Sequence, residues 1–351
     1  VPVVHEYGSL GCSGDLAPLA HCALVLMGEG EVLDGSVVRP AASALAEHGL
    51  APIELAEKEG LALINGTDGM LGQLVLALAD LALLMDTADL AAALSIEGQL
   101  GTDRTFAADL MALRPQLGQA VSAANLRTFL AGSPILASHR YGDGVVQDAY
   151  SLRCTPQVHG SLRDAVGYAT LIAERELAAA IDNPSVLPDG RVESHGNFHG
   201  APLAHVLDFL AIPVADVASI SERRTDRFLD VHRNRGLPPF LADDPGIDSG
   251  LMIAQYTQAG IVSTLKRLAV PASVDSIPSS ALQEDHVSMG WAAARKLRTA
   301  LDGLARVLAI EILTAARGVE LREPLRPGAA TSAALSALRE TVPGPGPDRF
   351  L

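Results

Sequence analysis

The pentapeptide Gly11-Cys12-Ser13-Gly14-Asp15 places a serine among small residues, directly before an apolar stretch. Three roles fit this pattern. A serine in a Gly-x-Ser-x-Gly turn can be a hydrolase nucleophile, although Asp15 stands where that motif has its last glycine. Ser13 or Asp15 can instead cap the helix that follows. Because glycine has no Cβ, the Gly14 nitrogen can also bend back onto the preceding carbonyl and close a ring.

A second polar cluster, residues 147–154, spaces an amide, a phenol and a guanidinium three residues apart. On a helix, Gln147, Tyr150 and Arg153 would project to roughly one side. Such a triplet can be an ordinary solvated helix face. It can also form a binding site, because the planar fork of Arg153 matches a carboxylate and the Tyr150 hydroxyl can donate or accept a hydrogen bond.

Three other clusters leave a structural and a functional interpretation open. His195 and His199 are four residues apart, the spacing of a metal-binding pair on a helix, but the glycines around them disfavour a helix and a metal. A backbone that closely approaches another group is the alternative. Residues 65–68 and 283–286 each precede an apolar run and can be helix caps. Five polar clusters on five loops of one chain together indicate a functional site.

Composition disfavours several classes of function. The 351 residues carry a formal net charge of -15, which opposes binding to nucleic acid or to an anionic membrane. The apolar runs contain polar residues such as Gln73 and Asp80, as buried core helices do and membrane spans do not. The three cysteines, Cys12, Cys22 and Cys154, are too sparse for a disulfide framework or a zinc ribbon, and they predict a cytoplasmic location.

Helical spacing of apolar residues extends over most of the chain. Aromatic residues make up only 4% of the sequence, which favours closely packed helices over a β-sandwich. We therefore predict an all-α (mainly α) fold, a bundle of long buried helices with the polar clusters on loops at the helix ends. Residues 341–348 are expected to be irregular. The expected helices are residues 16–27, 70–94, 161–181, 204–221, 253–268 and 288–317.

The polar clusters also carry a resemblance to a known family. In chain order, GSLGCSGDLAPLAH, EGLALINGT, VVQDAYSLRCTPQ, GNFHG, SERR, LPPFL, SGLMIAQ, SVDSIP and QEDHVSM closely resemble the aromatic amino acid lyases. The similarity extends over essentially the whole sequence. It implies one helical lyase domain over residues 1–351, a long-helix bundle of the aromatic amino acid lyase and fumarase-like type, and a homotetramer whose active sites each use loops from three subunits.

The resemblance further implies a prosthetic group made from the chain itself. In this family a small residue, a serine and a glycine cyclise and lose water to form 4-methylideneimidazole-5-one (MIO), and the matching residues are Cys12, Ser13 and Gly14. Cys12 stands where alanine is commoner, but only its backbone and Cα enter the ring. The electrophile takes up the substrate amine, so that ammonia leaves more readily while a base removes a β-proton. Neither a metal nor an external cofactor is expected.

The same motifs imply roles for individual residues. Arg153 resembles the residue that binds the substrate carboxylate, and Asn65, Gln147 and Tyr150 resemble the polar residues around the electrophile and the amino group. Tyr150 is also a candidate catalytic residue.

Three more residues have implied roles. Phe198 resembles the residue that packs against the prosthetic ring, and Asp15 resembles a residue that assists ring formation. Glu284 resembles the carboxylate that faces the amine and imidazole end of the substrate. The stretch QEDHVSM favours histidine as the substrate and trans-urocanate as the product. The alternative is a tyrosine or phenylalanine lyase or an aminomutase of the same family.

Family members have a further segment before the Ser13 loop, which supplies a tyrosine as the β-proton base and a histidine that helps select the substrate ring. Neither residue is matched here, because the sequence begins shortly before Ser13. We therefore expect a chain that lacks this N-terminal segment and the extreme C-terminus. A catalytically incomplete fragment that retains only the oligomer-forming helices is a second alternative.

Overall fold

The computed structural model describes residues 1–350, which group into two compact units. The first unit comprises residues 1–77, 169–209 and 271–298, and the second comprises the remaining described residues. Four long helices have residues in both units: α4 (Asp68–Gly98), α9 (Thr155–Leu177), α10 (Ala201–Leu229) and α12 (Gly290–Glu320). The prediction of a mainly α fold is confirmed.

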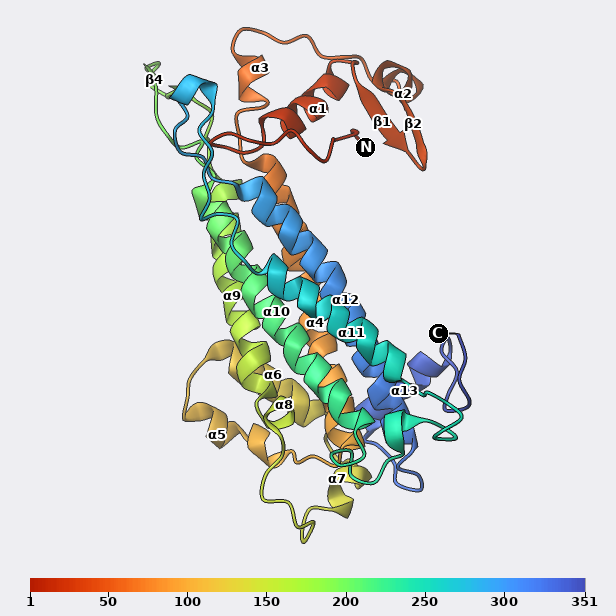
Figure 1. Cartoon of the computed structure of the whole chain (residues 1–351). Coiled ribbons are helices and arrows are strands. Elements are labelled where there is room, and N and C mark those ends of the chain that lie inside the picture. The colour runs from red at the N-terminus through yellow and green to blue at the C-terminus, as the bar shows by residue number, and fades with distance from the viewer. Residues whose placement is uncertain (351) are drawn as a thin grey trace. The chain divides into compact units, whose positions relative to one another are not determined.

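The first unit contains a small subdomain near the N-terminus. The remaining elements of this unit are α1 (Leu16–Leu26), β1 (Glu31–Asp34), β2 (Val37–Pro40), α2 (Ala41–Glu47), α3 (Glu59–Ala62), β3 (Ser185–Val186), β4 (Val192–Glu193) and the 3-10 helix η3 (Ser280–Leu282). Strands β1 and β2 pair antiparallel, with Leu33 opposite Val38. Val25, Val32 and Ala41 form an apolar core between α1, β1 and α2, which lie together in Figure 1.

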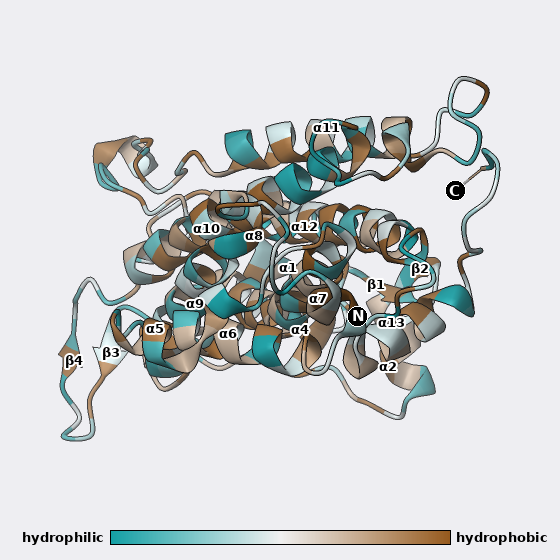
Figure 2. Cartoon of the chain, turned by 90° about the horizontal axis from the view of Figure 1, so that it is seen from below, coloured by the Kyte–Doolittle hydropathy of each residue, from teal (hydrophilic) through white to brown (hydrophobic). Residues whose placement is uncertain are grey.

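The second unit is almost entirely helical. Its remaining elements are η1 (Arg104–Phe106), α5 (Ala108–Ala112), α6 (Leu117–Phe129), α7 (Pro134–Ser138), α8 (Tyr150–Arg153), η2 (Pro239–Leu241), α11 (Met252–Leu268) and α13 (Ala329–Arg339). Ile96, Phe106, Leu126 and Leu152 belong to one of its apolar clusters and are almost completely buried. The helices carry hydrophobic stretches beside hydrophilic ones, as Figure 2 shows, because each packs one side against its neighbours.

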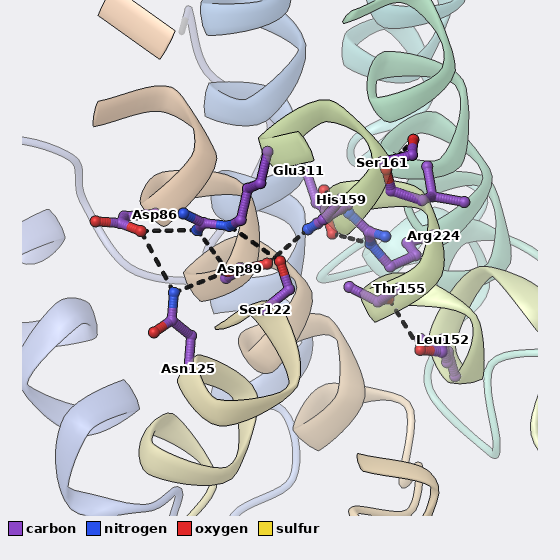
Figure 3. A network of polar contacts seen from close by, with 12 residues as sticks. Asp86, Asp89, Ser122, Asn125, Leu152, Thr155, His159, Ser161, Arg224 and Glu311 are labelled. Carbon is purple, nitrogen blue, oxygen red and sulfur yellow. Dashed lines mark hydrogen bonds and ion pairs between the residues drawn. The ribbon is translucent and has the colours of Figure 1, made fainter. Parts of the chain in front are cut away.

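A buried polar network joins α4, α6 and α9 inside the second unit (Figure 3). The Asp89 carboxylate, which is completely buried, accepts hydrogen bonds from His159 Nδ1 at 2.8 Å, Arg163 at 2.8 Å and Asn125 at 2.9 Å. Burial lowers the pKa of His159, and its hydrogen bond to Asp89 opposes this shift. A buried carboxylate with three donors is satisfied, so this network fixes the three helices relative to one another.

A second buried network joins α4, α10 and α12 in the same unit. Arg224 and Glu311 are both completely buried and form a bidentate ion pair, whose second hydrogen bond is 2.9 Å long. The Ser95 hydroxyl donates a further hydrogen bond of 2.7 Å to Glu311.

Helix α10 is long and apolar enough to cross a membrane by length and composition alone, but 67% of its most apolar 18-residue window is buried within the protein. This degree of burial is typical of a core helix.

The six predicted helices are all present, with shifted ends. Helix α9 begins six residues earlier than predicted and ends four residues earlier, and α10 extends to Leu229. Residues 341–348 are irregular, as predicted. The β1–β2 hairpin and the helices α2, α5, α6, α7 and α13 were not predicted.

Candidate active site

Ser13 lies in a buried bend at the start of α1. The backbone bends at each of residues 11–14, and the Ser13 side chain is only 2% exposed. Gly14 has a φ of +77°, a backbone conformation that residues other than glycine rarely adopt. Met70 Cε also lies 3.0 Å from the place that a Cβ on Gly14 would occupy. The hydrolase elbow lacks its context, because both sheets among residues 1–350 are two-stranded and antiparallel.

Asp15 has a partner in another helix. It occupies the N-cap position of α1, as predicted, but its side chain makes no capping hydrogen bond there, so this part of the capping interpretation is wrong. The carboxylate instead accepts a hydrogen bond of 2.9 Å from the backbone N–H of Met70, in the first turn of α4. Burial raises the pKa of Asp15 to about 7, with a smaller contribution from Asp68 and opposition from the backbone N–H groups of Met70 and Gly69.

A small cavity of about 20 Å³ lies beside this bend and is lined by Ser9, Gly11, Gly14 and Trp291, among others. Two side chains of its wall, Ser9 Oγ and Trp291 Nε1, are buried and have no hydrogen-bond partner among the described residues. Asp15 Oδ1 is likewise buried and has no hydrogen-bond partner among these residues. Buried polar atoms are normally paired, so these three atoms remain available to hydrogen-bond a further group at this turn.

Cys12 is held by two loops of the first unit. Its carbonyl oxygen accepts a hydrogen bond of 3.0 Å from the Gly200 N–H, and its thiol donates to the His286 carbonyl oxygen at 3.4 Å. Burial raises the pKa of the Cys12 thiol, and the negative charges of Glu284 and Asp285 raise it further. The thiol is therefore kept protonated rather than reactive.

Glu284 lies against the same turn. Its Oε2 is 3.6 Å from the place that a Cβ on Gly11 would occupy, and it accepts a hydrogen bond of 2.7 Å from the Ser279 hydroxyl. The interpretation of residues 283–286 as a helix cap is wrong, because α12 begins only at Gly290 and the hydroxyl of Ser288 accepts from the Gly290 N–H. The Glu284 carboxylate therefore lies beside the Ser13 turn and not at the N-terminus of α12.

The loop of residues 194–200 is not helical, so His195 and His199 do not form the metal pair that their spacing allows on a helix. His195 Nε2 lies 2.7 Å from Ser185 Oγ, and its Nδ1 accepts from the Asn197 N–H. Since Nδ1 is an acceptor, Nε2 carries the proton and donates to Ser185, which cannot then be activated as a nucleophile. Phe198, next to His199, is partly buried in this loop.

Asn65 lies before α4 and points to a neighbouring loop. Its amide donates hydrogen bonds to Asp182 Oδ1 at 3.1 Å and to the Asn183 carbonyl at 3.4 Å, and Lys58 forms an ion pair with Asp182. Residues 65–68 were expected to cap α4, but the Thr67 hydroxyl does not do so. It donates a hydrogen bond of 2.6 Å to the Glu176 carboxylate. These contacts attach the start of α4 to the loop after α9.

The remaining candidates lie in the second unit. Only Tyr150–Arg153 is helical (α8), so Gln147 lies in the preceding loop, but the Arg153 guanidinium donates a hydrogen bond to the Gln147 side chain. Tyr150 is 70% exposed and Gln147 is exposed. The shared-helix interpretation is therefore wrong for Gln147, whereas the pairing of Gln147 with Arg153 is present.

The structure thus forms two groups of candidate residues. The first unit brings Cys12, Ser13, Gly14 and Asp15 into one site with Glu284 and Gly200. The second unit holds the Gln147–Arg153 pair and Tyr150. The sequence did not identify Met70 or Ser279 as contributors to the first group. It offered His199 only as one of a metal pair and His286 only as part of a helix cap, not as partners of each other. The two histidines stand inside the quoted motifs GNFHG and QEDHVSM, which was the available signal.

Comparison with known proteins adds independent information. The family model described as aromatic amino acid lyase matches residues 1–340. The chain is 67% identical to a histidine ammonia-lyase of Streptomyces avermitilis over 353 residues, covering 100% of this chain and 69% of that protein.

Two solved structures are also similar to this chain over its whole length. The histidine ammonia-lyase of Trypanosoma cruzi has a TM-score of 0.90 at 42% identity, covering 100% of this chain and 66% of that one. The tyrosine aminomutase of Streptomyces globisporus has a TM-score of 0.92 at 38% identity, covering 100% and 70%.

Proposed function

We propose that this chain, which belongs to the aromatic amino acid lyase family, eliminates ammonia from L-histidine and releases trans-urocanate. The observation that carries the proposal is the high identity to relatives named for this activity, which extends over the whole chain. Glu284 beside the Ser13 turn supports it, because a carboxylate there can meet an amine or imidazole. Among the alternatives, an aminomutase and a phenylalanine lyase have solved relatives of lower identity, at 38% and 27%.

We also propose that Cys12, Ser13 and Gly14 form the MIO group. The residues present fit it, since Gly14 has a positive φ that glycine readily adopts, and three buried polar atoms around the turn have no hydrogen-bond partner within residues 1–350. When formed, the group supplies an electrophile for the substrate amine. No metal or external cofactor is included in the proposal.

The chain's own residues would then bind and orient the substrate. The Arg153 guanidinium, oriented by Gln147, offers a planar fork to the substrate carboxylate. Glu284, oriented by the Ser279 hydroxyl, offers an acceptor to the imidazole or the amine. Asn65 and the exposed Tyr150 add polar contacts, and Phe198 packs against the ring. We propose a homotetramer in which the active site combines loops from several copies, and a cytoplasmic location, which the three free cysteines support.

The test combines a mass and an activity. Purified full-length protein should have the calculated mass less two water molecules, and trans-urocanate absorbance should appear on incubation with L-histidine. Ser13→Ala cannot lose the serine hydroxyl, so the methylidene should be absent and activity should fall by several orders of magnitude while the helical circular dichroism persists. L-Tyrosine and L-phenylalanine serve as competing substrates. An unmodified mass for the wild-type protein, or turnover of another amino acid in preference to histidine, would overturn the proposal.

A further inference from the structure

His199 and His286 form a direct contact beside the Ser13 turn that no role assigned so far uses. Their rings are stacked with centroids 5.4 Å apart and an interplanar angle of 24°, and His199 Nε2 lies 3.3 Å from His286 Nδ1. His199 precedes Gly200, whose N–H donates to the Cys12 carbonyl, and the His286 carbonyl accepts from the Cys12 thiol. The pair therefore joins the two loops that hold Cys12.

The direction of the hydrogen bond between the histidines follows from a third contact. The backbone N–H of Ala201 donates to His199 Nδ1 at 3.3 Å, so this nitrogen is unprotonated. The proton of the neutral His199 ring is then on Nε2, and this N–H donates to His286 Nδ1. His199 is thus fixed at one nitrogen by the first turn of α10 and at the other by the loop that carries Glu284.

The carbonyl held by this arrangement is the one at which ring closure would begin. Closure forms a bond from the Gly14 nitrogen to the Cys12 carbonyl carbon, and the carbonyl electron pair moves to the oxygen. That oxygen then leaves as water with the hydrogens of the Gly14 and Ser13 nitrogens. A second water takes the Ser13 hydroxyl and its Cα hydrogen and leaves the methylidene double bond. No oxidant or reductant is required.

We propose that the Gly200 N–H stabilises the negative charge that develops on the Cys12 oxygen, and that the His199–His286 pair positions this N–H. Gly200 is buried and caps the N-terminus of α10, a helix of 29 residues, so the helix dipole adds positive potential at the same oxygen. The loop of His286 is itself held, since the Val287 N–H donates to Ser276 Oγ at 2.9 Å. His199 and His286 are therefore positioning residues. This inference rests on the proposed MIO group.

Two nearly isosteric variants test the pair. In His286→Asn the side-chain oxygen stands about where Nδ1 stood and can still accept from His199, whereas His286→Leu has the same shape and no acceptor. Newly made full-length protein is isotopically labelled in a short pulse, and intact mass spectrometry follows the fraction that has lost two waters. His48→Leu, at an exposed position in the first unit, is the control. Thermal unfolding of each variant is measured in parallel.

His286→Asn should close the ring at the wild-type rate, and His286→Leu should close it about tenfold more slowly, because a displaced oxyanion donor loses part of its effect. His199→Phe, which keeps a stacked ring without nitrogens, should show the same delay and guards against a folding defect of His286→Leu. Closure at the wild-type rate in both His286→Leu and His199→Phe, or a lowered melting temperature without a delay, would overturn the inference. A wild-type protein that never loses two waters would instead overturn the proposed function.

Discussion

The Asp15 carboxylate, directly before α1, accepts a hydrogen bond of 2.9 Å from the Met70 N–H in the first turn of α4. This contact attaches the Ser13 turn to a long helix of the core. Asp15 is completely buried, and its other carboxylate oxygen, Oδ1, has no hydrogen-bond partner among residues 1–350. Such a carboxylate is costly to ionise, and perturbed carboxylates of this kind are concentrated at functional sites.

Asp15 should make the protein less stable as the pH rises. Its pKa is about 7 in the folded state and near the ordinary value of 3.8 when unfolded, so between these values the folded protein binds the extra proton. The free energy of unfolding should therefore fall from about pH 4 to about pH 7 and then level off, by at most roughly 4 kcal/mol. Asp15→Asn should reduce this fall, measured by urea unfolding at a series of pH values. Asp216→Asn, on the exposed side of α10, is the control, and the same slope in Asp15→Asn and wild type would contradict the assignment.

Glu284→Gln separates catalysis from ring formation. Glutamine can still accept the Ser279 hydroxyl, so the loop should keep its shape, but the negative charge beside Gly11 is lost. We expect histidine turnover to fall by about 10²-fold or more, as on loss of an acid–base group, while the near-ultraviolet absorbance of the ring is unchanged. The Cys12 thiol should also titrate at lower pH, because the Glu284 charge contributes to its raised pKa. Unimpaired turnover would remove Glu284 from the site.

Arg153→Lys should weaken substrate binding. The guanidinium uses one edge on Gln147 and can present its planar fork to a carboxylate, and a lysine ammonium can do only one of these well. The expected loss is about 1.5–3 kcal/mol, or roughly ten- to a hundredfold in the dissociation constant of L-histidine. Titration calorimetry in the inactive Ser13→Ala background, with Arg191→Lys as the exposed control, measures this loss. An unchanged affinity would mean that Arg153 only orders its own loop.

The sequence predicted the long helices because each carries apolar residues at helical spacing, and their packing follows from that pattern. It missed the β1–β2 hairpin, although Asp34-Gly35 between two short apolar runs is a hairpin signal, because each strand has only four residues. The ends of α9 were wrong because Thr155 and Pro156 start that helix, where a loop was expected.

The candidate residues were found from motifs, but their contacts were not. Asp15 looks like a cap of its own helix in the sequence, and only the fold shows that it caps α4 instead. Likewise, nothing in the spacing of His199 and His286, 87 positions apart, indicates that their rings meet. Contacts of this kind depend on how distant loops converge, which local sequence patterns do not encode.

The crossing of α6 and α9 gives a sharp test of the fold of the second unit. Gly160 is buried on α9, and a Cβ there would lie 2.3 Å from the Gln119 nitrogen and 2.4 Å from its Cα, both in the backbone of α6. Gly160→Ala must therefore push the two helices apart, which should cost about 3 kcal/mol or more, since backbone atoms cannot move aside as a side chain can.

Gly167, two turns later on α9, is the matched control. It is exposed, and a Cβ there would meet no described atom within 4 Å, so Gly167→Ala should stabilise the protein by about 0.5–1 kcal/mol through helix propensity alone. Urea unfolding midpoints of the two variants should thus move in opposite directions from the wild type. If Gly160→Ala were as stable as Gly167→Ala, α9 could not approach the Gln119 backbone of α6 as closely as the structure places it.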